Sequence, residues 1–121
     1  EKNMVEAKDV VGEVEGRACV LIDDMIDTAG TIVAAAEALT ERGAASVCCA
    51  ATHGVFSGPA IDRLKNSKLD KVVITNTLPL PPEKPIDKIE VLSAAGIIAD
   101  AIDAVFEDTS VSSIFDGHNQ S

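Results

Sequence analysis

The feature that most constrains the fold of this chain is the repeated passage from a short apolar run into a segment with helical spacing. Residues 18–22 form an apolar run, and apolar residues within 32–39 then recur every three or four positions until Gly43. The run is typical of a buried strand, and the spacing is typical of an amphipathic helix. A strand that leads through a few residues into a helix is the first half of a βαβ unit, from which parallel sheets are built.

The same order of elements continues along the chain. Further strands are expected at 46–52, 71–75 and 89–92, and further helices begin at Gly58-Pro59 and at Ala95. Proline suits the first turn of a helix, whereas the prolines within 78–82 would remove donors from a sheet and predict a loop. The last helix carries its apolar face on Ile98, Ala101, Ile102 and Val105. A weaker pattern favours a strand pair at 4–7 and 10–14.

These elements predict an α/β fold with three layers, in which helices flank a mostly parallel sheet. The 121 residues suffice for a single domain over 1–121, with a polar tail at 107–121 that lacks periodicity. Ligands of such sheets bind in the crevice at the carboxyl ends of the strands.

Composition narrows the choice of ligands. The net charge is −10, and Trp and Tyr are absent, so the chain offers neither the positive field nor the aromatic platforms that nucleic acids require. An acidic membrane surface is disfavoured for the same electrostatic reason. Arg63, Lys65 and Lys68 lie close together in sequence, but Asp62 and Asp70 flank them, and we interpret this stretch as a solvated face. Small ligands therefore fit better than polyanions.

The cysteine and histidine content favours a reducing environment and no structural zinc. Three cysteines, an odd number, lie in apolar runs without a C-x-x-C spacing, and the two histidines are far apart. No apolar run approaches the ~20 residues needed to span a bilayer, and no signal peptide is recognised. We therefore expect a cytoplasmic protein. The chain begins at Glu1 with Met4 inside it, and we expect a piece of a longer protein.

The segment 23–31, DDMIDTAGT, carries the chemistry that can be read from the residues. It connects the first strand to the first long helix, so the first amides of that helix lack partners within the helix. Those amides and the positive end of the helix dipole favour a phosphate. Thr28 and Thr31 add hydroxyl donors, and Ala29-Gly30 keep side chains away from the ligand. Neither a Walker A loop nor a G-x-G-x-x-G motif occurs.

The acids of this segment suggest a sugar beside the phosphate. Ionised Asp23 and Asp24 can only accept hydrogen bonds, which suits the vicinal hydroxyls of a ribose. Anions near a phosphate are costly without a cation, so Mg²⁺ is an expected companion. In the alternative interpretation the segment is an acidic helix cap, in which Asp27 or Thr28 satisfies free amides.

The run VLIDDMIDTAGTI at 20–32 resembles the phosphoribosyl-binding motif of type I phosphoribosyltransferase folds, in the form found in ribose-phosphate pyrophosphokinases. The resemblance continues in ATHGVFSGPA at 51–60, TNT at 75–77 and SVSSIF at 110–115, where Ile114 stands in place of the more usual Leu. It covers nearly the whole chain in order. It implies the C-terminal half of an enzyme that transfers diphosphate from ATP to ribose 5-phosphate with Mg²⁺.

The resemblance also implies roles for individual residues. Asp23 and Asp24 would hold the ribose hydroxyls, and the 5-phosphate would be bound by Asp27, Thr28, Ala29, Gly30 and Thr31. Nothing here matches the family's mobile basic loop and ATP pocket, so no catalytic residue is expected in this segment, the metal ligands stay open, and the isolated chain should bind ribose 5-phosphate weakly without turnover.

The tail and the overall function retain alternatives. The resemblance implies that Ser110, Ser112 and Phe115 help form an allosteric site for phosphate or ADP at a subunit interface of a homo-oligomer, whereas composition alone equally favours a disordered polar end. Other candidates for the whole protein are an ordinary phosphoribosyltransferase and a non-catalytic regulatory homologue. His53 borders the expected crevice, where a packing role is favoured over catalysis.

Overall fold

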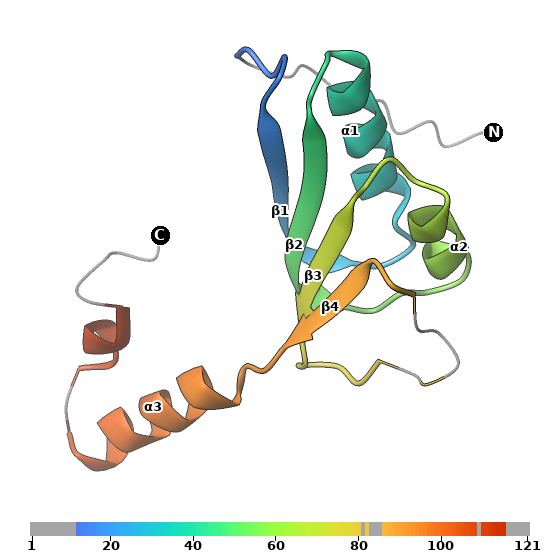
Figure 1. Ribbon diagram of the computed structural model, residues 1–121. Coiled ribbons are helices and arrows are strands. Elements are labelled where there is room, and N and C mark those ends of the chain that lie inside the picture. Colours follow the sequence, from blue (N-terminus) through green and yellow to red (C-terminus); the bar gives the residue numbers. More distant parts are fainter. Residues whose placement is uncertain (1–11, 81, 83–85, 109, 116–121) are drawn as a thin grey trace.

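In the computed structural model, which describes residues 12–80, 82, 86–108 and 110–115, four parallel strands form one sheet in the order β1-β2-β3-β4 (Figure 1). The elements follow each other as β1 (Ala18–Ile26), α1 (Gly30–Glu41), β2 (Ser46–Gly54), α2 (Ala60–Lys65), β3 (Lys71–Thr75), β4 (Ile89–Leu92), α3 (Ala95–Phe106) and the 3-10 helix η1 (Val111–Phe115). The expected α/β class, with a parallel sheet and flanking helices, is confirmed.

The core lies between one face of the sheet and the helices α1 and α2 (Figure 1). Alternate residues of the inner strands point into it, and α1 contributes one residue per turn; the main members are Val47, Cys49, Val72, Ile74, Ile32, Ala36, Leu39 and Leu64. This arrangement follows from the two periodicities, since a strand turns every second side chain and a helix every third or fourth to the same side. Both helices therefore cover the same face.

The other face of the sheet carries exposed apolar side chains. Val20 is 62% and Ile22 is 83% exposed, and Val91 on β4 is also exposed. Parallel sheets usually have both faces covered. In the described part of the chain, this face has no covering helix, because α1 and α2 pack on the opposite side.

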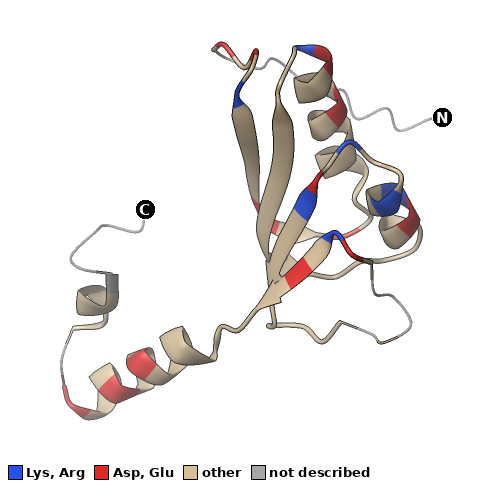
Figure 2. Ribbon diagram, in the orientation of Figure 1, with Lys and Arg blue, Asp and Glu red and all other residues tan. Residues whose placement is uncertain are grey.

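Helix α3 extends away from the sheet beyond the end of β4 (Figure 1). It occupies the expected range and has the expected apolar stripe, but Ile98, Ile102 and Val105 on that stripe are more than half exposed. Among the described elements it contacts η1 alone. Figure 2 shows that its charged residues are all acidic, whereas α2 carries both signs.

Strands β1 and β2 are both longer than the sequence predicts: β2 was expected at 46–52 and ends at Gly54. We expected β1 to end before the acids, but it continues to Ile26 because its pairing with β2 persists through Met25 opposite His53 and Ile26 opposite Gly54. Ladder hydrogen bonds thus outweigh the low strand propensity of aspartate. The acids therefore belong to the strand rather than to the loop.

Other expectations fall at the ends of the chain. Residues 12–14 form no strand, and the rest of the expected pair at 4–7 and 10–14 lies outside the described residues. Within the polar tail 107–121, residues 111–115 form the short helix η1, which the lack of periodicity did not reveal. His118 lies outside the described residues.

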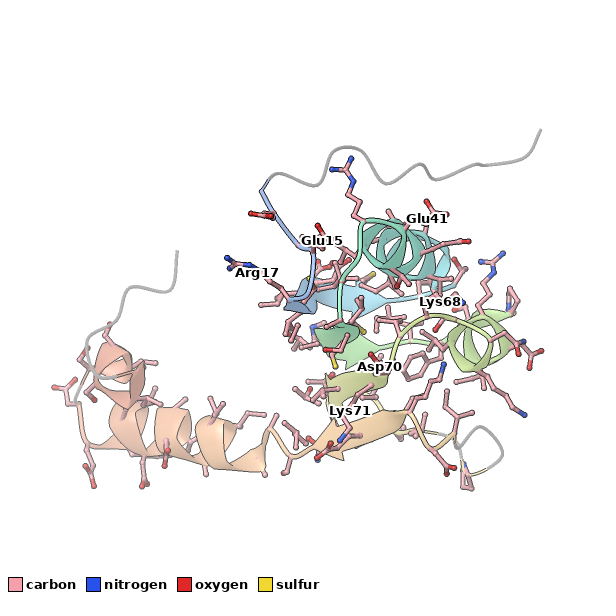
Figure 3. The ribbon with its side chains drawn as sticks, turned by 45° about the horizontal axis from the view of Figure 1, so that its top comes forward. Glu15, Arg17, Glu41, Lys68, Asp70 and Lys71 are labelled. Atoms are coloured by element: carbon pink, nitrogen blue, oxygen red, sulfur yellow. The ribbon has the colours of Figure 1, made fainter. Side chains whose placement is uncertain are left out.

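Asp70 fixes the stagger of β3 against β2 at the amino end of the sheet. Its backbone N–H donates to the Val47 carbonyl at 2.8 Å, and its Oδ2 accepts from the Val47 N–H at 3.0 Å. Figure 3 shows Asp70 beside Lys71 where β3 begins. Because the four strands are parallel, their carboxyl ends lie at one edge of the sheet, where the loop between β1 and α1 begins.

Candidate functional site

The loop between β1 and α1 presents unpaired backbone donors. The N–H groups of residues 28–32 have no acceptor within the described part of the chain, and the helix has no side-chain cap. The first hydrogen bond of the helical i to i−4 kind in α1 is donated by the Val33 N–H to the Ala29 carbonyl at 3.1 Å. Free amides at the head of a helix bind anions because N–H dipoles and the helix dipole act in the same direction.

A pocket of about 230 Å³ lies over these amides. Its lining contains all five residues expected to bind the 5-phosphate, together with Asp23, Met25, Ile26 and Ile32. Ala29 is buried and has φ 67°, a left-handed conformation that an L-residue other than glycine adopts at a cost of about 1–2 kcal/mol. Strain of this kind persists where the surrounding structure enforces it, and it is concentrated at binding sites.

The two adjacent acids differ in their relation to this pocket. Asp23 lines it, whereas Asp24 does not. Asp24 is exposed, and its Oδ1 accepts a hydrogen bond from the Met25 N–H at 2.8 Å. Hydrogen bonding with the Asp23 side chain and with the Met25 amide lowers the pKa of the Asp24 carboxyl below its ordinary value of 3.8. Both carboxylates belong to the last part of β1, just before the loop, and Asp23 is the one that lines the cavity.

Residues 55–57, which follow β2, hold the loop between β1 and α1 by backbone hydrogen bonds. The N–H groups of Val55 and Phe56 donate to the Ile26 carbonyl at 2.9 and 3.1 Å, and the Ser57 N–H donates to the Asp27 carbonyl at 2.9 Å. Phe56 is 1% exposed and belongs to the core. The stretch 51–60 therefore holds the carbonyl side of the loop, which leaves the amide side facing outward.

His53 is hydrogen-bonded to the turn that follows β3 rather than free in the crevice. Its Nδ1 lies 2.8 Å from the Thr77 hydroxyl, which in turn lies 3.3 Å from the Thr52 carbonyl. Thr75 donates to the same carbonyl at 2.7 Å. A neighbouring residue, Asn76, accepts from the Ala94 N–H at 2.8 Å and so joins β3 to the start of α3. The stretch 75–77 is thus a junction of backbone and side-chain hydrogen bonds.

Comparison with known proteins decides the family. Residues 3–116 match the family described as Phosphoribosyl synthetase-associated domain. The chain belongs to this family. A relative named ribose-phosphate pyrophosphokinase from Streptomyces avermitilis is 61% identical over 114 residues, which cover 94% of this chain and 35% of that protein. One of the same name from Aquifex aeolicus is 53% identical over 115 residues, covering 95% of this chain and 37% of that protein.

A solved member of the family has the same fold. The crystal structure of phosphoribosylpyrophosphate synthetase from Mycobacterium smegmatis matches with a TM-score of 0.77 and 50% sequence identity, over 81% of this chain and 33% of that one. The resemblance seen in the sequence is thereby confirmed, and the segment corresponds to the C-terminal portion of these relatives. It spans about a third of their length.

One residue of the site was not identified from the sequence. We interpreted Arg63 as part of a solvated face, but its Nη1 donates to the Thr28 carbonyl at 3.1 Å. The side chain is exposed as expected, yet it contacts the loop. Only the packing of α2 beside α1 brings the two segments together, and 35 residues separate them in sequence. No sequence signal local to either segment reveals this contact.

Within residues 12–80, 82, 86–108 and 110–115, no three acidic, histidine or cysteine side chains converge as metal ligands. Nor does any described helix have the length and apolar character needed to cross a bilayer. The tail residues Ser110 and Ser112 are exposed and lie apart from the loop pocket; the side chain of Phe115 lies outside the described part.

Proposed function

We propose that this segment binds ribose 5-phosphate as part of a ribose-phosphate pyrophosphokinase, which transfers the diphosphoryl group of ATP to that sugar and yields phosphoribosyl pyrophosphate and AMP. The observation that carries the proposal is the set of unpaired amides at residues 28–32, which open into a pocket bordered by a carboxylate. A pocket of about 230 Å³ is below the ~300–1,000 Å³ typical of drug-sized ligands, which suits a sugar phosphate. The family membership supports the reaction.

In this proposal the amides and hydroxyls bind the 5-phosphate while the acids bind the ribose. Thr28 and Thr31 add donors beside the amides of 29–31, and Asp27 lines the same pocket. Asp23 accepts from a sugar hydroxyl, and Asp24 holds a second hydroxyl or acts through the water that surrounds it. These groups orient the sugar so that its anomeric hydroxyl meets the activated phosphate, and orientation alone can lower the barrier by several kcal/mol.

Magnesium fits the donor set without a dedicated protein cage. Mg²⁺ commonly takes one or two carboxylates and completes its shell with substrate oxygens and water, and Asp23 and Asp24 offer such carboxylates. When bound, the ion neutralises charge on the transferred phosphoryl groups. ATP and the catalytic groups belong, on this view, to the part of the full-length protein outside these 121 residues.

The exposed apolar surfaces support contacts with that remaining part and with further subunits. The bare sheet face and the stripe of α3 expose Val20, Ile22, Ile98, Ile102 and Val105, and surfaces of this kind usually mark an interface. We place the allosteric site for ADP or phosphate, formed by Ser110, Ser112 and Phe115, at such a subunit interface. The three free thiols suit a cytoplasmic, reducing location.

The experiment that tests the proposal is calorimetric titration of the full-length protein with ribose 5-phosphate, inorganic phosphate and ribose. Gly30→Val and Thr31→Val should abolish phosphate affinity, because the first crowds the loop with a side chain whose β-carbon would lie 3.3 Å from Arg63 Nη1, and the second removes a donor. Asp24→Asn should weaken ribose 5-phosphate more than inorganic phosphate. Equal losses for both ligands in the Asp24 variant would refute the division of roles, and unchanged phosphate affinity in Gly30→Val would refute the site.

Two other functions are separated by simple assays. An ordinary phosphoribosyltransferase would release pyrophosphate from phosphoribosyl pyrophosphate when a base is added, whereas the proposed enzyme would release AMP from ATP when ribose 5-phosphate is added. A regulatory homologue would do neither and would lack the basic residues of the mobile loop in its upstream sequence. The stretch at 51–60 favours the pyrophosphokinase.

A further inference from the structure

Arg63 contacts the phosphate loop from outside the pocket. Its guanidinium lies 3.1 Å from the Thr28 carbonyl, and the same Nη1 lies 3.3 Å from where a β-carbon at position 30 would stand. Arg63 is absent from the lining of the pocket over the amides, but it borders a neighbouring hollow together with Thr28, Gly30 and Thr31. It therefore touches the loop on one side while the unpaired amides open on another.

Because of peptide geometry, the hydrogen bond from Arg63 to the Thr28 carbonyl also fixes the direction of the Ala29 N–H. The bond between Thr28 and Ala29 is trans, as all described peptide bonds are. In a trans peptide the C=O and the N–H that share the plane point in opposite directions. Because the Thr28 carbonyl points to Arg63, the Ala29 N–H points away from Arg63. The direction of that donor is thus set by a residue on another helix.

The constraint acts where the backbone is strained. Ala29 has φ 67°, and relaxing it would rotate the adjacent peptide. A rotated peptide would bring the Thr28 carbonyl toward the bound anion, which would repel it. A hydrogen bond from a cationic donor stabilises the observed orientation more than a neutral one would.

Resting on the proposed function, we propose that Arg63 is a positioning residue for the 5-phosphate: it holds the Thr28 carbonyl so that the Ala29 N–H faces the phosphate. It acts through the loop rather than as a direct ligand. Its positive charge also offsets part of the repulsion between the phosphate and the nearby acids.

The test compares three variants of the full-length protein by calorimetric titration with ribose 5-phosphate, inorganic phosphate and ribose. Arg63→Gln removes the charge and shortens the side chain, Arg63→Lys keeps the charge, and Lys65→Gln is the matched control on the same helix. We expect Arg63→Gln to weaken both phosphate-bearing ligands about three- to tenfold, the loss of one exposed charge-assisted hydrogen bond. Arg63→Lys should recover most of this loss, and ribose should bind equally to all variants.

A second readout follows the donor itself. In the ligand-free protein, the amide proton of Ala29 should change its NMR chemical shift in Arg63→Gln and stay in place in Lys65→Gln. A merely structural role would lower the thermal midpoint without moving this resonance, and that result would overturn the proposal. Equal phosphate affinity in Arg63→Gln and Lys65→Gln would also overturn it, even if the variant folds less stably.

The outcome separates this inference from the function on which it rests. If Gly30→Val abolishes phosphate binding while Arg63→Gln leaves it unchanged, the site stands and the role of Arg63 is refuted. If the unmodified protein binds ribose 5-phosphate no better than ribose, the phosphate site itself fails.

Discussion

Replacing Gly54 by alanine should destabilise the fold beside the loop between β1 and α1. Gly54 ends β2 opposite Ile26 and is buried against the core. A β-carbon placed there would lie 2.7 and 2.9 Å from ring carbons of Phe56, and 2.8 Å from Cδ1 of Ile74. Both neighbours are 1% exposed, so neither can move into solvent without opening the core.

The magnitude follows from these overlaps. Non-bonded carbons are most stable at about 3.5–4.0 Å, so each contact must open by roughly 0.6 Å or more. Introducing a methyl group into a packed core typically costs about 1–3 kcal/mol. Alanine also lowers the conformational entropy of the unfolded chain, which offsets about 0.4–1 kcal/mol of this loss of stability. We therefore expect the free energy of unfolding to fall by about 1–2 kcal/mol, measured by urea denaturation of this chain followed by circular dichroism.

Two controls test the stated cause. Gly96→Ala makes the same chemical change in α3, where a β-carbon meets no atom within 4 Å, and it should be neutral or stabilising by up to about 1 kcal/mol. Ile74→Val removes the Cδ1 atom, so the double variant with Gly54→Ala should lose less than the sum of the single variants. A Gly54→Ala protein as stable as the parent, or strictly additive losses, would refute the reasoning.

Three further predictions concern the core and helix α2. Burial raises the pKa of the Cys49 thiol from 9.0 to about 11, so iodoacetamide at pH 8 should leave Cys49 unmodified in the folded chain and label it after denaturation, as mass spectrometry would reveal. Because the unfolded thiol loses its proton at lower pH than the folded one, stability should fall as pH rises from about 9 to about 11, a trend that Cys49→Ala should reduce. Lys88 Nζ donates to the Leu64 and Ser67 carbonyls at 3.0 Å each, so Lys88→Met should destabilise the chain by about 1 kcal/mol in urea melts, whereas Lys65→Met should not.

Most of the fold was readable because local pattern and tertiary packing agree. The range of β3 matches the expected 71–75, and α1 begins where its amides were expected to be free. The extent of β1 was not readable, because Asp23 and Asp24 disfavour a strand and only the pairing with β2 keeps them in one. The apolar stripe of α3 was also identified. Such a stripe predicts a buried face but does not show which element packs against it, and among the described elements α3 contacts η1 alone.

The candidate site likewise has a part that the sequence predicts and a part that it does not. Asp23 and residues 27–31 of its lining were expected from the sequence, because they are near neighbours along the chain and a strand, a short loop and a helix suffice to bring them together; Asp24, also expected, does not line the pocket. The hydrogen bonds that hold the loop were missed, because they come from residues 55–57 and from Arg63, which are distant in sequence. Spacing rules describe neighbours along one element and say little of contacts between elements.

A site made of backbone amides depends on what holds its carbonyls. The donors at residues 28–32 belong to peptide groups, and each peptide can face the ligand with its N–H or with its C=O. The segment after β2 fixes the carbonyls of Ile26 and Asp27, and Arg63 fixes that of Thr28. If the loop binds phosphate as proposed, its affinity should depend on these remote hydrogen bonds as well as on the loop's own side chains. On the proposed function, we expect the motif at 23–31 to bind phosphate most tightly when the stretch at 51–60 and Arg63 on α2 hold these carbonyls.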